Sequence, residues 1–560
     1  MSEDFSPLRS YYKAGTETVR LPGDEDDKLY DVDLAGDDHE SVEFDASLRK
    51  RTERSKTVNQ ELMPTAYDMA SGDLGTSQPF NISGKVNNSY KSTDRQKDES
   101  EETYEIEDAI EMLGYGRFQF RISCIAGLAW TADAGEMMVL AILSPALQCD
   151  WGLDAWKLGL ITSIVFVGMM MGSSLWGYIS DKYGRKFVLV LSSIFTMYFG
   201  VLSALSLTFY WLLIFRCLVG FCIAGGGQAV TLYSEYLPSK ARAKSIVGIE
   251  VFYALGSVYC TTLALAVMPV MGWRWFLGFS AAPLLVFIIL AYWMPESMRF
   301  NVARGHLDDA SKTLKQIASE NKTAMPVGRL VVPSKKAERG RLGDLFIPKL
   351  RITTLLLWFI WFANTFSYYG IVLLTTELLE IDSDDVCNTI LEGSTPPVTC
   401  ALDCRPLETS NYIELIWTAL AEFPGLLLTF FIIDLIGRKF SMGLLFVMFA
   451  LATALVAVCK GRILLIVFLF AARCFIAGAF QVAFLYATEI YPTNCRSIGL
   501  GTCSSLARIG AIITPFVAQV LLQKSIQATI GIYAGVAAAA AVASVFLPIE
   551  TKGRQLEESH

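Results

Sequence analysis

Long apolar stretches, separated by short polar or charged segments, fill the chain from about Ile122 to its last residues. Most are close to the roughly 20 residues that an α-helix needs to cross the hydrocarbon core of a bilayer. The pattern therefore predicts about twelve transmembrane helices, at residues 122–146, 157–179, 187–207, 209–232, 246–270, 273–294, 353–377, 411–433, 440–458, 463–484, 498–521 and 526–547.

A different pattern precedes these spans. Residues 1–104 combine acidic blocks with runs rich in Ser, Thr and Asn, and they show no helical period. Such a segment cannot bury enough apolar surface to fold alone, so it is predicted to be a disordered acidic tail. The stretch that begins Met1–Asp4 has neither a basic region nor an apolar core. We therefore expect no cleavable signal peptide and a cytosolic tail.

A short amphipathic pattern lies between Tyr104 and Phe120, just before the first span. Its apolar residues, which share one helical face opposite three acidic residues, are Ile106, Ala109, Ile110 and Leu113. This pattern predicts a short interfacial helix that leads into the first transmembrane helix.

Basic residues cluster in alternate loops and predict the orientation. Outside the long segment from Arg299 to Arg351, they are Lys182, Arg185, Lys186, Lys240, Arg242, Lys244, Arg438 and Lys439. Because cytoplasmic loops carry an excess of Lys and Arg, we expect these loops and both termini to face the cytosol. The chain then divides into an N-terminal six-helix half (105–298), a basic cytosolic loop (299–352), a C-terminal six-helix half (353–547) and a cytosolic tail (548–560).

Composition narrows the class of protein. Of 560 residues, 53% are hydrophobic and only 18% are charged, with a mean hydropathy of +0.41. Soluble domains are about 25% charged, so these values exclude a soluble enzyme or a nucleic-acid-binding protein. The net charge of −8 reflects the acidic tail more than the membrane region.

Cysteines outside the spans suggest disulfides. The four that we expect on the non-cytosolic side are Cys149, Cys387, Cys400 and Cys404. Exposed thiols seldom persist in an oxidising compartment, so two disulfides are predicted there, one of them local to the 379–410 loop. The pairing stays open.

Charged motifs repeat between the two halves. The segment Asp181–Lys186 reappears as Asp434–Lys439, and Glu235…Arg242 reappears as Glu489…Arg496 with the same internal spacing. The dipeptide Arg216–Cys217 returns as Arg473–Cys474 at nearly the same offset. Two related six-helix halves with a site between them are a plan used by secondary transporters.

The repeated residues also carry a family resemblance. Gly177–Lys186 (GYISDKYGRK) resembles the signature loop of the major facilitator superfamily. The motifs Trp273–Trp275, Pro295–Arg299 and Pro548–Gly553 resemble its sugar-porter and organic-ion-transporter branches, although the sugar-porter ending lacks the inserted Ile549. Leu128–Met138 and Ser367–Gly370 resemble a branch of vesicle proteins. The resemblance implies an all-α major facilitator fold and a multi-pass protein of synaptic or secretory vesicle membranes.

The repeated charges are candidate gating residues at cytosolic helix ends. They are Asp181, Arg185, Glu235 and Arg242 in the first half, and Asp434, Arg438, Glu489 and Arg496 in the second. Asp181 is expected to pair with Arg242 or Arg185, and to lock the cytosolic ends of adjacent helices. Simple topology anchors are the alternative, but they do not explain the repeated acidic partners.

Asp133 and Glu136 lie three residues apart near the middle of the first span, on one helical face. An intramembrane charge costs about 2.5–3.5 kcal/mol on insertion scales, so it usually marks a substrate pathway or a proton relay. Neighbouring carboxylates suit proton coupling, because binding one proton relieves their repulsion. A structural pairing with a basic residue on another helix is the alternative. Histidine is excluded from this role, because all three histidines lie outside the spans.

Further candidates for substrate binding or ion coupling lie in other spans. They are Trp130, Asn364, Tyr368, Tyr369, Glu422 and Arg508. Organic-anion and carnitine-type relatives carry arginine at the position that Arg508 matches, and a guanidinium favours a carboxylate on the substrate. A salt bridge from Arg508 to Asp133 or Glu422 is the alternative reading.

Together these features predict a transporter of a small organic ion that works by alternating access, with the proton as a candidate coupling ion. The second hypothesis is a vesicle membrane protein that has lost transport and serves as a scaffold, with trafficking partners bound to its tail. No nucleotide-binding Gly-x-x-x-x-Gly-Lys motif occurs, which argues against ATP-driven transport. No enzymatic activity, cofactor, metal site or nucleic-acid partner is expected.

Overall fold

The computed structural model describes residues 103–332, 341–381, 407–458, 461–492 and 495–552. Apart from its last two residues, the acidic tail predicted at 1–104 lies outside these ranges, as do Cys387, Cys400 and Cys404.

Twelve spans in the described part are long and apolar enough to cross a membrane, which confirms the all-α prediction. In the first half they are α3 (Arg117–Trp151), α4 (Ala155–Tyr183), α5 (Arg185–Ala204), α6 (Phe209–Ile223) continued by η1 (Ala224–Gly227) and α7 (Gln228–Ser234), α8 (Ser239–Met271), and α9 (Trp273–Ser280) continued by α10 (Ala282–Leu290) and η2 (Ala291–Trp293). In the second half they are α13 (Arg351–Glu380), α15 (Thr409–Leu420) continued by α16 (Glu422–Ile436), α17 (Arg438–Val456), α18 (Arg462–Ile490), α19 (Arg496–Pro515) continued by η4 (Phe516–Leu521), and α20 (Ile526–Val545).

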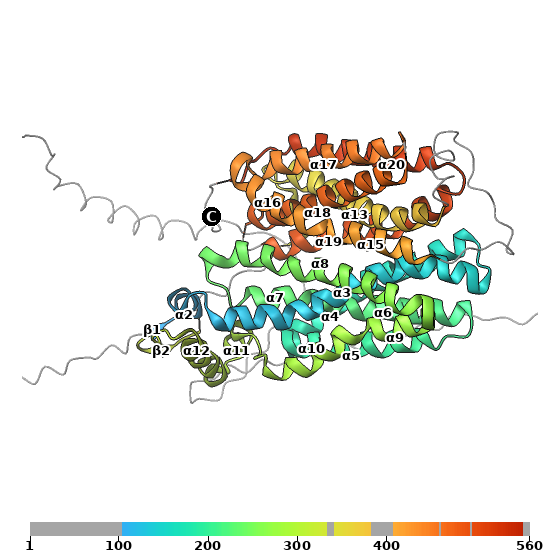
Figure 1. Ribbon diagram of the computed structural model, residues 1–560. Helices are drawn as coiled ribbons and strands as arrows, with labels where there is room; N and C mark the ends of the chain where they lie inside the picture. The colour runs from blue at the N-terminus through green and yellow to red at the C-terminus, as the bar shows by residue number, and fades with distance from the viewer. Residues whose placement is uncertain (1–102, 333–340, 382–406, 459–460, 493–494, 553–560) are drawn as a thin grey trace, which may run out of the picture. The chain divides into compact units, whose positions relative to one another are not determined.

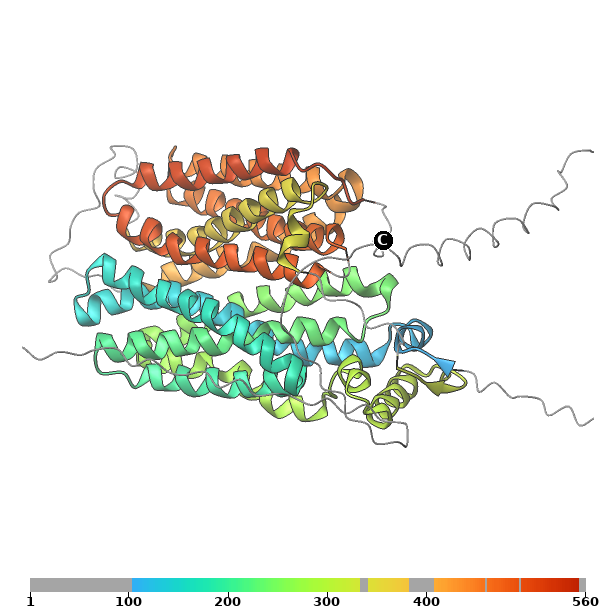
Figure 2. The same cartoon turned by 180° about the vertical axis from the view of Figure 1, so that it is seen from behind.

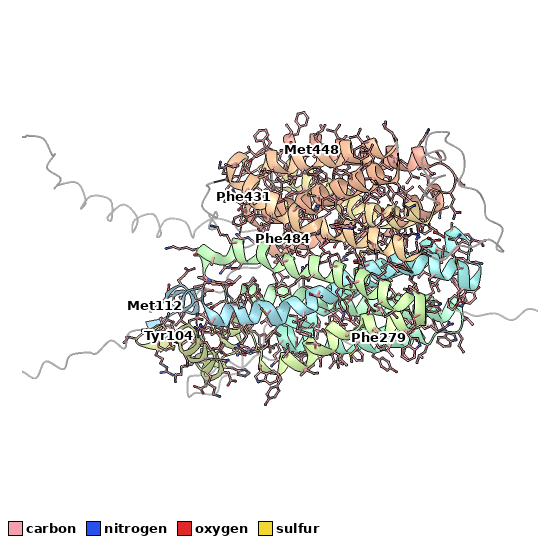
Figure 3. The ribbon with its side chains drawn as sticks, in the orientation of Figure 1. Tyr104, Met112, Phe279, Phe431, Met448 and Phe484 are labelled. Carbon is pink, nitrogen blue, oxygen red and sulfur yellow. The ribbon has the colours of Figure 1, made fainter. Side chains whose placement is uncertain are left out.

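The two halves form separate helix bundles that lie side by side (Figures 1 and 2). Helices α3, α4 and α8 of the first half pack against α13, α15, α16 and α19 of the second. Phe484 of α18 lies on the side of its bundle that faces the first half (Figure 3). Phe279, Phe431 and Met448 are exposed by 42%, 64% and 36%, as expected for side chains that contact lipid.

Glycines bring one pair of helices into backbone contact in each half. A Cβ atom on Gly168 of α4 would lie 2.1 Å from the Cys217 carbonyl oxygen of α6. A Cβ atom on Gly425 of α16 would lie 2.3 Å from the Cys474 carbonyl oxygen of α18. The same interval along the chain separates both pairs of residues, so the repeat extends to helix packing. Only glycine permits such close approach of two helices.

The segment 299–352, predicted as a loop, is partly folded. It contains α12 (Leu307–Asn321), β2 (Arg329–Leu330) and η3 (Leu342–Phe346), and the short α11 (Met298–Ala303) begins just before it. The amphipathic helix α2 (Ile106–Leu113) forms as predicted, and β1 (Thr103–Tyr104) pairs in parallel with β2. The sequence pattern predicted that the apolar face of α2 would lie in the membrane interface, and the structure shows a different partner for it. Its apolar face is buried in a protein core with apolar residues of α12, which replace the membrane as its apolar partner.

Glu111 of α2 joins this folded segment to the start of α8. Its carboxylate accepts a hydrogen bond from the Ser239 backbone amide. Burial raises the pKa of the Glu111 carboxyl, but the Ser239 hydrogen bonds and the positive charges of Arg242 and Lys240 outweigh it and lower the pKa below 4.5. The ionised carboxylate therefore stabilises the fold above that pH, and this contribution is lost as the pH falls through the lowered value.

Candidate functional site

A pocket of about 840 Å³ opens between the two halves, where α3, α8, α13 and α19 begin. Residues of α7 and α8 line it from the first half, and residues of α18 and α19 line it from the second. We call this the pocket end of the bundle and the opposite end the far end. The charged residues in its lining are Glu235, Arg242, Arg299, Lys349, Glu489 and Arg496.

Beside the pocket, Arg185 of α5 organises a charge cluster in the first half. Its guanidinium lies 3.4 Å from Asp181 and 3.2 Å from Glu235. The Glu296 carboxylate accepts hydrogen bonds from the Arg185 and Lys186 backbone amides, at 2.8 and 3.0 Å, and so caps the first turn of α5. Of the two partners predicted for Asp181, the structure shows Arg185.

The second half repeats this cluster around Arg438 of α17. Its guanidinium lies 3.6 Å from Asp434 and 3.1 Å from Glu489. Glu550 accepts hydrogen bonds from the Arg438 and Lys439 backbone amides, at 2.9 and 3.1 Å. The sequence singled out the motifs that contain Glu296 and Glu550 only as a resemblance, so this capping role was missed.

A glycine makes room for each capping carboxylate. Gly184 and Gly437 have φ angles of +111° and +88°, which L side chains rarely adopt. A Cβ atom on Gly184 would lie 2.3 Å from the Glu296 carboxylate, and one on Gly437 would lie 2.9 Å from the Glu550 carboxylate. The glycine of each Gly–Arg–Lys sequence is thus required by backbone geometry.

Arg242 and Arg496 do not pair with the glutamates of their own motifs. Arg242 donates to the Leu237 carbonyl oxygen at 3.1 Å, and Arg496 donates to the Tyr491 carbonyl oxygen at 3.3 Å. The pairing of Glu235 with Arg242 and of Glu489 with Arg496, suggested by their spacing, therefore differs from what is found. Both arginines line the pocket, one from each half.

Inside the bundle, Glu136 and Glu422 are each held by a buried arginine. Arg216 of α6 lies 2.5 Å from Glu136 of α3. Arg473 of α18 lies 2.8 Å from Glu422 of α16, and both side chains are at most 3% exposed. For Glu136, the alternative of a structural pair is thus the one observed.

Glu422 also connects to other helices of both halves. Tyr368 of α13 donates a hydrogen bond to its carboxylate at 2.7 Å. Ser257 of α8, in the first half, donates to the same carboxylate at 3.3 Å. This polar network therefore crosses the interface between the two halves.

Asp133 and Arg508 are different, because neither forms an ion pair within the part of the chain that the structure describes. Arg508 acts electrostatically on Asp133 without a direct contact. The Arg508 Nη1 atom lies 2.8 Å from the Met169 sulfur. The predicted alternative of a salt bridge from Arg508 to Asp133 or Glu422 is therefore not found.

The other candidates lie close to these groups. Trp130 donates a hydrogen bond to Glu250 of α8 at 3.0 Å. The Tyr369 ring packs against that of Phe166 of α4, with ring centroids 4.8 Å apart and ring planes tilted by 36°. The Asn364 side chain is 2% exposed, and its buried Oδ1 atom has no hydrogen-bond partner among the described residues.

A polar cluster joins the two halves at the far end. Gln519 of η4 donates to the Ser144 hydroxyl of α3 at 2.6 Å and to Glu377 of α13 at 3.2 Å. The Ser144 hydroxyl also donates to Glu377, at 3.5 Å. Sequence reasoning missed all three residues, because none of them belongs to a repeated motif.

Cys149 is disulfide-bonded. Its predicted partners lie outside the described residues, so the prediction of two disulfides stands as a prediction. Within the described residues, no group of three or more His, Cys, Asp or Glu side chains is arranged to hold a metal ion.

Comparison with known proteins gives a consistent result. The model of the sugar (and other) transporter family matches residues 78–380 and 407–560. The chain is 53% identical over 460 residues to the synaptic vesicle 2-related proteins of Rattus norvegicus and of Xenopus laevis, which covers 82% of this chain and 83% of each relative. The inward-open structure of the xylose transporter XylE from E. coli aligns with a TM-score of 0.59 at 16% identity, over 79% of this chain and 98% of that one. At this identity the likeness shows the fold alone.

Proposed function

This chain belongs to the sugar (and other) transporter family of the major facilitator superfamily, and we propose that it carries a small organic ion across a vesicle membrane by alternating access. The observation that carries the proposal is the asymmetry between the two ends of the bundle. A pocket separates the halves at one end, whereas the Ser144, Glu377 and Gln519 cluster joins them at the other.

The pocket end is proposed to be cytosolic, because the basic loops lie there. Glu235 and Arg242 line the pocket from the first half, and Glu489 and Arg496 line it from the second. When the halves approach, each glutamate gains an arginine of the opposite half as a new partner. These four residues then act as the cytosolic gate, and the Arg185 and Arg438 clusters hold the helix ends that carry them.

Asp133 and Arg508 are proposed to serve the substrate or the coupled proton, since neither forms an ion pair among the described residues. Glu136 and Glu422 are proposed instead to hold the Arg216 and Arg473 side chains in place through their ion pairs. The names of the 53% identical relatives support a vesicle location.

Ser144→Ala tests alternating access at the far end. The change removes the two hydrogen bonds by which Ser144 joins the halves at the far end, and it alters the volume by little. Each lost hydrogen bond is worth about 0.5–1.5 kcal/mol, so the population of the state closed at the pocket end should rise by about threefold or more. Double electron–electron resonance between nitroxide labels at Thr231 and Thr488, on opposite walls of the pocket, measures this as a shift toward shorter distances.

Ser193→Ala is the matched control, because among the described residues the Ser193 hydroxyl bonds only within its own helix, to the Leu189 carbonyl oxygen. Its distance distribution should equal that of the unchanged chain. A single distance common to all three proteins would argue against alternating access and would favour the scaffold hypothesis.

A further inference from the structure

Asp133 and Glu250 are carboxylates inside the bundle that no basic side chain pairs with among the described residues. No ion pair among the described residues involves Asp133 or Glu250, in contrast to Glu136 and Glu422. Glu250 accepts a hydrogen bond from the Trp130 indole. It lies in the body of α8, and it acts electrostatically with Asp133.

The charge balance of this region is negative when Asp133 and Glu250 are both ionised. The pairs of Glu136 with Arg216 and of Glu422 with Arg473 are each neutral. Arg508 offsets one further carboxylate at a distance. With Asp133 and Glu250 ionised, one negative charge has no counterpart, and a buried charge without a counterpart is costly.

Aromatic rings lead from the pocket to these carboxylates. Successive ring centroids lie 5.9–6.3 Å apart along the series Phe484, Trp361, Phe480, Tyr368, Tyr253 and Trp130. Phe484 lines the pocket, and Trp130 binds Glu250. Gln481, also in the pocket lining, lies beside Glu250 as well. The series therefore connects the pocket with the unpaired charge.

An unpaired hydrogen-bond acceptor lies on α13, the helix that also carries Trp361 and Tyr368. Asn364 lies one turn from both Trp361 and Tyr368 on α13, which places the three on one helical face. Its buried Oδ1 atom has no donor among the described residues. Leaving a buried acceptor unpaired is destabilising, so a ligand that brings N–H or polarised C–H groups would relieve this cost.

We infer that the site takes a small organic ammonium cation, held between the Asp133 and Glu250 carboxylates and the faces of Tyr253, Tyr368 and Trp130. This inference rests on the proposed transport function. Aromatic faces attract cations through the quadrupole of the ring, and quaternary ammonium groups are bound in this way. Arg508 then offsets Asp133 and does not bind a substrate carboxylate.

The test compares ligands of one shape and different charge. Choline and 3,3-dimethyl-1-butanol differ by one atom, because carbon replaces the charged nitrogen. Glycine betaine and 3,3-dimethylbutyrate supply the zwitterion and the anion. Isothermal titration of the purified full chain should show choline bound at least about tenfold more tightly than the alcohol, and more tightly than either carboxylate.

Glu250→Gln should reduce this preference for choline by about tenfold, and Tyr253→Leu should weaken choline binding without weakening that of the alcohol as much. Asp309→Asn, on the exposed surface of α12, is the charge-matched control and should bind as the unchanged chain does. Equal affinity for choline and the alcohol, tighter binding of 3,3-dimethylbutyrate, or no binding of choline overturns the inference. The label distances at Thr231 and Thr488 are independent of this result, so alternating access can stand while the substrate class fails.

Discussion

Glu422→Gln should lower the stability of the fold by about 3–5 kcal/mol, because it leaves the Arg473 guanidinium buried without its counter-charge. Arg473 is 1% exposed and cannot reach water. The Tyr368 and Ser257 hydroxyls, which donate to Glu422, also lose a charged acceptor. Thermal unfolding in detergent, followed by intrinsic fluorescence, should show a clearly lower midpoint.

The control is the double variant Glu422→Met with Arg473→Met. It removes both charges and keeps similar side-chain volumes, so it should be less damaging than Glu422→Gln alone. If the double variant is as unstable as the single one, or less stable, the lone buried charge is not the cause of the loss.

Gly168→Ala should also be strongly destabilising, although it adds a single methyl group. The new Cβ atom would meet the Cys217 carbonyl oxygen, so α4 and α6 must separate. Overpacking of this kind typically costs about 1–3 kcal/mol, and here the obstacle is backbone, which cannot rotate away. The mirrored change Gly425→Ala should behave alike. The same unfolding assay measures both.

Gly177→Ala is the matched control on α4, because no atom lies within 4 Å of the position of its new Cβ. Alanine favours a helix over glycine, so this variant should be as stable as the unchanged chain or more stable. Equal losses at Gly168 and Gly177 would attribute the effect to helix propensity or local function, and would contradict the backbone contact.

The fold was largely predictable, because its determinants are local. A span must be apolar over about 20 residues whatever its neighbours are, so hydropathy located all twelve. The repeat of Asp181–Lys186 in Asp434–Lys439 then indicated two related halves. The burial of α2 was not predictable, since it depends on α12, some two hundred residues away in the chain.

The partners of the charged residues were much less predictable. Arg216 and Arg473 are equivalent in the repeat, and yet Arg216 pairs with Glu136 of the first span whereas Arg473 pairs with Glu422 of the eighth. The first and eighth spans are not equivalent in the repeat, so the acidic partner of one arginine does not predict the partner of the other. The repeat preserves backbone contacts, and the acidic partners differ.

The depth of Glu250 in the bundle was not predictable for a related reason. The apolar pattern begins near residue 246, which places Glu250 close to the start of the predicted span. The helix itself begins at Ser239. Its first turns are polar and line the pocket, so the apolar pattern does not include them. Hydropathy locates only the part of a helix that lies in apolar surroundings. Where the helix extends further, as α8 does, a residue such as Glu250 is wrongly placed at its end.

In each half, a glutamate that follows the last span caps the start of another helix, and this affects truncated forms of the chain. Glu550 lies just after the twelfth span, and it caps α17 through the backbone of Arg438 and Lys439. A nonsense codon at position 548 would leave every transmembrane helix encoded in full. The shortened product would nevertheless lack the anion at the start of α17, which is worth about 0.5–2 kcal/mol. A gene interrupted there, or a reporter fused directly to Leu547, would therefore yield a protein with a complete set of spans and a weakened second half.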